Sequence, residues 1–90
     1  MEETPDYFVH FRPETFRRYE DGWVAPNIDE LREAKRRSGK TGSQLAAMMG
    51  VNSRTLRKWI GGLHAIPYAA WMIWLFSIKL ITEDRLVDRY

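Results

Sequence analysis

Two short helical patterns joined by a glycine turn constrain the fold of this chain more than any other feature of its sequence. Thr41 precedes Gln44 by three residues, which is the spacing of a capping box at the start of a helix. The apolar residues that follow stop at Gly50, and a second amphipathic stretch begins three residues later and stops at a pair of glycines. These patterns predict helices over residues 42–49 and 53–60, joined by a turn of three or four residues.

The same start and stop signals predict further helices on either side of this pair. Asn27 and Glu30 have the spacing of a second capping box, and a glycine ends the apolar repeat that follows, which predicts a helix over residues 28–38. Pro67 suits a first helical position and opens a helix that we expect to run to about Ile81.

The two ends of the chain give weaker signals. Residues 13–20 have the composition of a short helix, and Thr82 can cap a short C-terminal helix. The predicted fold is therefore all-α, a compact bundle of about five helices with an N-terminal arm whose structure is left open. We divide the chain into this arm over residues 1–26, a helical domain over residues 27–81 and a short helix or tail over residues 82–90.

The composition excludes several classes of protein. Ninety residues suffice for one domain with one core, and 44% of them are apolar. The chain has no cysteine, which excludes disulfides, zinc ribbons and thiol enzymes and agrees with a cytoplasmic protein. The longest apolar run, residues 67–78, is much shorter than the roughly 20 residues that a membrane span needs, so we expect no membrane association.

No constellation of residues in the sequence supports catalysis or a cofactor. The two histidines lie in unlike contexts, no serine or cysteine elbow is present, and no metal-ligand pair occurs at helical spacing. Gly39-Lys40-Thr41 is similar to the end of a phosphate-binding loop, but the glycine that begins such a loop is missing. We therefore predict that the protein is not an enzyme and has neither a cofactor nor a metal site.

Basic residues are concentrated in the middle of the chain. Residues 32–58 carry eight lysines and arginines against one acid, whereas residues 1–31 carry eight acids against three bases. Such a block, inside a chain whose net charge is only +2, is typical of a protein that binds a polyanion. A solvated helix face is the alternative explanation.

The residue types between positions 42 and 61 suit two helices that pack closely. Ala46 is small where the helices must approach each other, and Gly50 can adopt a positive φ at the turn. We expect Val51 to fill the corner between the helices. The other positions separate into a core set, Leu45, Met49, Leu56 and Trp59, and an outward set, Ser53, Arg54, Arg57 and Lys58.

In this register the sequence resembles the lambda-repressor-like (Cro/CI, XRE) family of helix-turn-helix transcriptional regulators. The resemblance is carried by Gln44-Leu45-Ala46, Gly50-Val51-Asn52-Ser53-Arg54-Thr55-Leu56, Trp59, Gly61-Gly62 and Ala65-Ile66-Pro67-Tyr68. It covers residues 27–81, and the chain is loosely similar to short phage or mobile-element regulators. Residues 1–26 have no counterpart in the family.

The resemblance implies how the chain would bind DNA and what it would do. The helix over residues 53–60 would lie in the major groove, and the preceding helix would cross the backbone. The residues expected to contact bases are Ser53, Arg54, Arg57 and Lys58. Those expected to contact phosphates are Lys40, Ser43, Gln44, Asn52, Thr55 and Tyr68. The implied function is a sequence-specific, double-stranded-DNA-binding transcriptional regulator that acts as a repressor or autorepressor.

The helix expected from Pro67 is apolar nearly all round, so something must cover the part that the core does not. Either the N-terminal arm covers it, through Tyr7, Phe8, Phe11, Phe16 and Trp23, or a second subunit does. We predict both, with a homodimer interface at Trp71, Trp74, Leu75 and Ile78 and an inverted-repeat operator. The alternative function is a protein-interaction module or antitoxin-like partner that uses the same fold without reading DNA.

Overall fold

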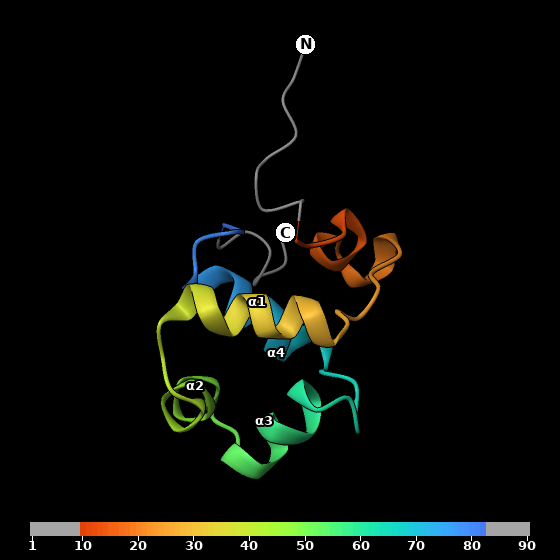
Figure 1. Ribbon diagram of the computed structural model, residues 1–90. Helices are drawn as coiled ribbons and strands as arrows, with labels where there is room; N and C mark the ends of the chain where they lie inside the picture. The colour runs from red at the N-terminus through yellow and green to blue at the C-terminus, as the bar shows by residue number, and fades with distance from the viewer. Residues whose placement is uncertain (1–9, 83–90) are drawn as a thin grey trace.

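The computed structural model describes residues 10–82, and within them every regular element is helical (Figure 1). The four α-helices are α1 (Ile28–Ser38), α2 (Gly42–Met49), α3 (Ser53–Ile60) and α4 (Tyr68–Ser77). Two short 3-10 helices, η2 (Pro13–Phe16) and η3 (Tyr19–Asp21), precede them. In Figure 1, α2 and α3 lie together at one end of the molecule, and α1 and α4 lie above them. None of the helices in this part of the chain is long and apolar enough to cross a membrane.

The starts of α1 and α2 confirm both predicted capping boxes. At α1 the Asn27 side chain accepts a hydrogen bond from the Glu30 amide at 2.8 Å, and the Glu30 carboxylate accepts one from the Asn27 amide at 2.7 Å. Thr41 and Gln44 make the same reciprocal pair at α2, at 3.1 and 2.9 Å. These side chains satisfy amides that the first turn of a helix leaves without a helical partner, which fixes where each helix begins.

A three-residue turn joins α2 to α3, as the glycine pattern predicts. Gly50 has a φ of 71°, and the Val51 amide donates to the Ala46 carbonyl at 2.9 Å while the Gly50 amide donates to the Ala47 carbonyl at 3.2 Å. This is the Schellman arrangement, which requires a left-handed residue after the helix and therefore favours glycine. The chain is redirected within three residues, so α2 and α3 pack against each other.

Three of the weaker predictions need correction or fall outside the structure. The segment predicted as one short helix over residues 13–20 forms two 3-10 helices, Pro13–Phe16 and Tyr19–Asp21, separated by two extended residues. The last helix ends at Ser77, before the predicted Ile81, because Lys79 adopts a φ of 64° and the Leu80 amide donates to the Leu75 carbonyl. The predicted C-terminal helix after Thr82 lies outside the described residues.

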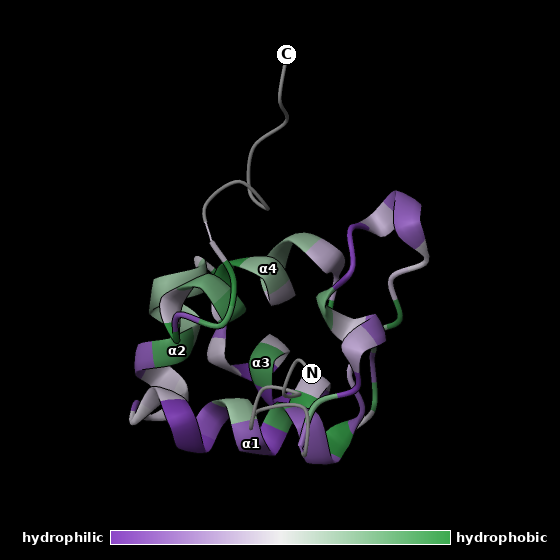
Figure 2. Cartoon of the chain, turned by 90° about the horizontal axis from the view of Figure 1, so that it is seen from above, coloured by the Kyte–Doolittle hydropathy of each residue, from purple (hydrophilic) through white to green (hydrophobic). Residues whose placement is uncertain are grey.

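The core is built on α4, which is the most apolar ribbon in Figure 2. Trp71, Trp74 and Leu75 are each 0% exposed, and they pack with buried residues from all the other α-helices. Ala46, 2% exposed, has the small side chain that the close packing of α2 and α3 requires.

The N-terminal segment covers part of α4, which confirms that prediction for Phe11 and Phe16. The Phe11 ring lies 6.1 Å from the Trp71 ring, and both phenylalanines are buried. The Thr15 carbonyl accepts hydrogen bonds from the indole nitrogens of Trp71, at 2.9 Å, and Trp23, at 3.1 Å. Tyr7 and Phe8, the other residues predicted to cover α4, lie outside the described part of the chain.

An ion pair joins this segment to α1. Glu30 is 2% exposed, and its carboxylate accepts hydrogen bonds from the Arg12 amide at 2.7 Å and from the Arg12 guanidinium at 2.8 Å. Burial raises the pKa of the Glu30 carboxyl, but the hydrogen bonds from Arg12 and from the Asn27 amide outweigh burial and leave this pKa below its ordinary value. One carboxylate therefore caps α1 and holds the N-terminal segment in place.

Candidate nucleic-acid interface

Helix α3 separates a buried apolar side from an exposed basic side. Leu56 and Trp59 are 1% and 6% exposed and face the core. Arg54, Arg57 and Lys58 are exposed on the other side of the helix, and α3 contains no acidic residue. At 100° per residue, Ser53, which is half-buried, falls on the same side as these three cations. The structure therefore brings all four predicted base-contacting residues to one face of one helix.

The N-cap of α3 fixes the backbone from which this basic side projects. The Asn52 side chain accepts a hydrogen bond from the Arg54 amide at 2.7 Å. Arg54 thus lies in the first turn, next to the end of the helix that the turn from α2 holds in place. The cap uses the Oδ1 acceptor of Asn52 and leaves its Nδ2 donors for a phosphate.

Five of the six predicted phosphate-contacting residues lie in two groups, at the starts of α2 and α3. Lys40, Ser43 and Gln44 are exposed around the start of α2, where backbone amides point outward. Asn52 and Thr55 flank the first turn of α3, with Asn52 exposed and Thr55 half-buried.

Tyr68 has different surroundings from the other five. Its ring forms T-shaped pairs with the rings of Trp23, at 5.3 Å between centroids, and Tyr19, at 5.7 Å. This aromatic cluster joins the N-terminal segment to the start of α4, so packing accounts for Tyr68 without a ligand.

Two arginines near the end of α1 are engaged within their own helix. Arg36 and Arg37 both pair with Glu33, Arg37 through its Nε at 2.8 Å. The hydrogen bonds from Arg36 and then Arg37 lower the pKa of the Glu33 carboxyl to about 2. Arg37 also lies over the Phe11 ring, at 5.5 Å from its centroid. These contacts favour the structural explanation for this pair, whereas the cations of α3 have no acid on their own helix.

The predicted dimer interface is wrong for three of its four residues. Trp71, Trp74 and Leu75 are each 0% exposed, so a second subunit cannot reach them while the fold is intact. Ile78, which follows the last residue of α4, is half-buried and packs against the core. The sequence could not separate the buried from the exposed side of this helix, because apolar residues occupy both.

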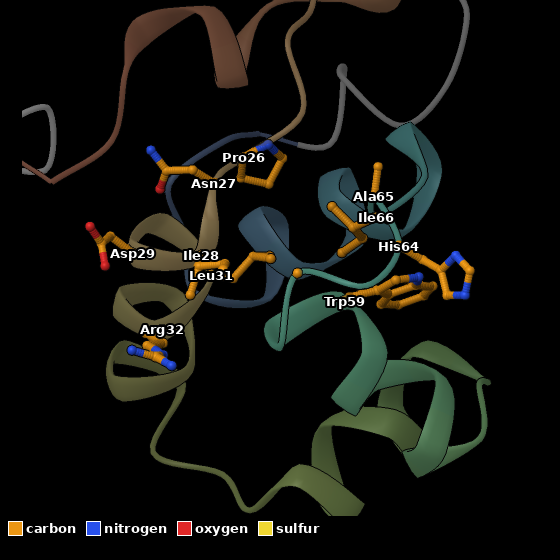
Figure 3. A pocket seen from close by; sticks show the side chains of 11 residues that line it. Pro26, Asn27, Ile28, Asp29, Leu31, Arg32, Trp59, His64, Ala65 and Ile66 are labelled. Carbon is orange, nitrogen blue, oxygen red and sulfur yellow. The ribbon is translucent and has the colours of Figure 1, made fainter.

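The structure also has a groove between α1 and the loop after α3, which the sequence did not predict (Figure 3). It encloses about 710 Å³, with Leu31, Trp59 and Ile66 among its apolar lining residues. Asp29, Arg32 and His64 also line it and extend away from its centre in Figure 3. Gly62, which also lines the groove, has a φ of 82° that favours glycine, and a Cβ there would lie 2.7 Å from Cδ1 of Ile28, so the Ile28 side chain would have to move. Residues 10–82 hold no group of three or more side chains arranged to bind a metal ion.

Two curated relatives share the central part of this chain. Both are named Transcriptional repressor protein KorC, from Escherichia coli, and they are 44% and 41% identical to this chain over 54 residues. Each match covers 57% of this chain and 64% of the relative, so the chain spans less than two thirds of the proteins it matches. A match that covers more than half of the chain includes the middle of the chain wherever it begins. Each match therefore includes Leu45 and Ala46 of α2. No family model and no solved structure matches the chain.

Proposed function

We propose that this protein is a transcriptional repressor that binds double-stranded DNA and reads its sequence with α3. The observation that carries the proposal is the exposed basic side of α3, which combines Arg54, Arg57 and Lys58 and lies opposite the buried Leu56 and Trp59. The similarity to two proteins named as transcriptional repressors supports the direction of regulation.

In this proposal α2, the turn and α3 act as a helix-turn-helix of the lambda-repressor-like type. Helix α3 lies in the major groove, and α2 crosses the backbone with its N-terminus toward a phosphate. Arg54 and Arg57 each donate two hydrogen bonds to O6 and N7 of a guanine, because a guanidinium matches that pair of acceptors. Ser53 contacts a base edge, and Lys58 contacts a base or a phosphate.

The contacts to the DNA backbone position this helix. Lys40, Ser43 and Gln44 donate to the strand next to the start of α2, and Asn52 and Thr55 donate beside the start of α3. A protein of this kind binds an inverted repeat as a homodimer, with the two copies of α3 about 34 Å apart on one side of the duplex. Tyr68 remains a predicted phosphate contact, although its packing against Tyr19 and Trp23 explains its position without DNA.

Selection of bound fragments from a random pool of double-stranded DNA tests this proposal. We expect an enriched inverted repeat with G·C pairs in each half. The double variant Arg54→Ala/Arg57→Ala should lose the preference for that sequence and keep the far-ultraviolet circular dichroism spectrum of the parent, because both side chains are exposed.

The matched control is Arg17→Ala/Arg32→Ala, which removes the same charge from exposed positions outside α3. This control should keep the sequence preference and lose only a little affinity. If no sequence is enriched, or if both double variants behave alike, the protein does not read DNA with α3, and the interaction-module alternative takes its place.

A further inference from the structure

The outer side of α4 carries an exposed apolar stripe that the core does not use. Ala69, Ile73 and Phe76 are spaced by four and three residues, so they lie along one side of the helix. All three are exposed, Ile73 by 39% and Phe76 by 41%, whereas Trp71 and Trp74 on the opposite side are fully buried. We call Ala69, Ile73 and Phe76 the outer stripe of α4.

The surroundings of this stripe are those of an interface core. No residue of Tyr68–Ser77 is charged, although 29% of the whole chain is. At its C-terminal end the stripe continues into an open groove of about 660 Å³, whose lining includes one charged side chain, that of Lys79, beside Phe76 and Ile81. Interface cores are depleted in charged residues and enriched in large apolar and aromatic side chains, so the composition of this helix suits a contact site.

The order of side chains in the stripe indicates the partner. Ala69 lies four residues before Ile73, about 6 Å along the helix, and Phe76 lies three residues after it, about 4.5 Å; the first side chain is small and the second is large. If two copies of α4 cross antiparallel at Ile73, the alanine of each faces the phenylalanine of the other. The stripe is therefore complementary to itself in size, as an interface about a two-fold axis requires.

We propose that the outer stripe of α4 is the homodimer interface of this protein, with Ile73 at the two-fold axis. The inference rests on the proposed function in one respect, which is that both copies of α3 must face the same duplex. Figure 1 places α3 below the layer of α1 and α4, and Figure 2 places α4 on the side of that layer opposite α1. A two-fold axis beside α4 that runs from this layer toward α3 keeps both reading helices on the same side.

The interface between two such short helices is small, which favours a weak dimer. A helix of ten residues is about 15 Å long, and one pair of such helices buries less than the roughly 800 Å² per partner of a standard interface. We therefore expect a dimer that dissociates at micromolar concentrations without DNA, and which DNA stabilises by holding two copies on adjacent half-sites.

Cysteine cross-linking of the full chain tests the position of the axis. Because the chain has no cysteine, Ile73→Cys introduces a single thiol, and two thiols at the axis can form a disulfide when their Cβ atoms come within about 4.5 Å. The control is Leu63→Cys, in the loop after α3, which is 74% exposed and more accessible than position 73. Under mild oxidation without DNA, Ile73→Cys should become a covalent dimer well before Leu63→Cys does. Equal rates for the two variants would overturn the proposal.

Sedimentation equilibrium of Phe76→Glu gives a second, independent measurement. The charge placed in the stripe should weaken self-association by roughly 30-fold or more, as removal of a central interface residue does. Leu63→Glu should leave association unchanged. If Phe76→Glu alters the circular dichroism spectrum, Ala69→Glu replaces it, because Ala69 is exposed and contributes nothing to the core.

A wild-type chain that stays monomeric at about 100 micromolar would contradict the proposal. The stripe would then be covered by this chain's own terminal residues or by another protein. The outcome is separable from that of DNA recognition. If position 73 cross-links but no DNA sequence is selected, the proposed function is wrong and the proposed interface stands. If a DNA sequence is selected but position 73 does not cross-link, the proposed interface is wrong and the proposed function stands.

Discussion

Helix α3 and the segment of residues 10–26 have opposite relations to the rest of the molecule. The conspicuous side chains of α3, Arg54, Arg57 and Lys58, point to solvent, with no acid on their helix. Those of the N-terminal segment point inward, since Phe11 and Thr15 are buried and Arg12 pairs with the buried Glu30. In the proposed function, recognition and stability are therefore carried by different parts of this small chain. Substitutions in one region should leave the property of the other nearly unchanged.

The largest expected effect is on stability, from Phe11→Ala. Truncating a buried phenylalanine should lower the free energy of unfolding by about 3–5 kcal/mol, because the side chain packs between Phe16 and Trp71. Thermal or urea unfolding followed by circular dichroism measures the loss. Tyr19→Ala is the control in the same segment, and since Tyr19 is 71% exposed and loses only its ring contacts with Trp23 and Tyr68, it should lower the free energy of unfolding by no more than about 1.5 kcal/mol. Similar values for the two variants would mean that the segment is not part of the core.

The next largest effect is expected from Ala46→Leu, because Ala46 affects both the stability of the fold and the position of α3. A larger side chain at this buried position forces α2 away from α3 and should lower the free energy of unfolding by about 1–3 kcal/mol. It should also displace α3 and weaken binding to selected DNA. Ala47→Leu, one residue along and exposed, is the matched control and should do neither. A stable, fully binding Ala46→Leu variant would contradict the packing of α2 against α3.

A smaller effect, with a pH signature, is expected from Glu30→Gln. The amide cannot accept all the hydrogen bonds that the carboxylate accepts from Arg12 and Asn27, so the variant should lose about 1–2 kcal/mol at neutral pH. Because the pKa of Glu30 is lowered in the folded protein, its contribution is complete above the ordinary value of 4.5 and disappears as pH falls through the lowered value. The stabilities of wild type and variant, measured in urea from pH 7 to pH 2, should converge at the acid end. A constant difference across that range would refute the ion-pair explanation.

The smallest effect should come from Lys40→Ala, which removes one exposed cation near the start of α2. Loss of one phosphate contact should reduce the slope of log affinity against log salt by about 0.9 and weaken binding to all sequences alike. Titration of fluorescent DNA at several salt concentrations measures the slope. An unchanged slope would remove Lys40 from the interface without affecting the role of α3.

The sequence predicts structure well where the determining contacts are local. The bounds of α1, α2 and α3 agree with the prediction, because capping side chains and stop glycines lie within a few residues of each end. The end of α4 was missed because a lysine, Lys79, takes the left-handed position that glycine usually fills. Residues 13–20 were missed because their conformation depends on Thr15 and Phe16 being buried against other elements.

Contacts between distant residues account for what the sequence could not reveal about the site. Glu30 was identified as a capping residue, but its pairing with Arg12, 18 residues earlier, has no local pattern. In α4 the buried Trp74 and the exposed Phe76 are both large and apolar, so periodicity alone cannot assign a dimer face. The outward side of α3 was assigned because basic and apolar residues alternate there at helical spacing.

A double-mutant cycle between Arg54 and the base pairs of a selected site measures whether α3 reads the DNA sequence. Wild type and Arg54→Ala would each be titrated against the selected duplex and against duplexes in which single G·C pairs are replaced by A·T. If Arg54 reads a guanine, the coupling should be about 1–3 kcal/mol at one position of each half-site and close to zero at the others. Zero coupling at every position, with affinity unchanged by the substitution, would show that the exposed side of α3 does not read the sequence.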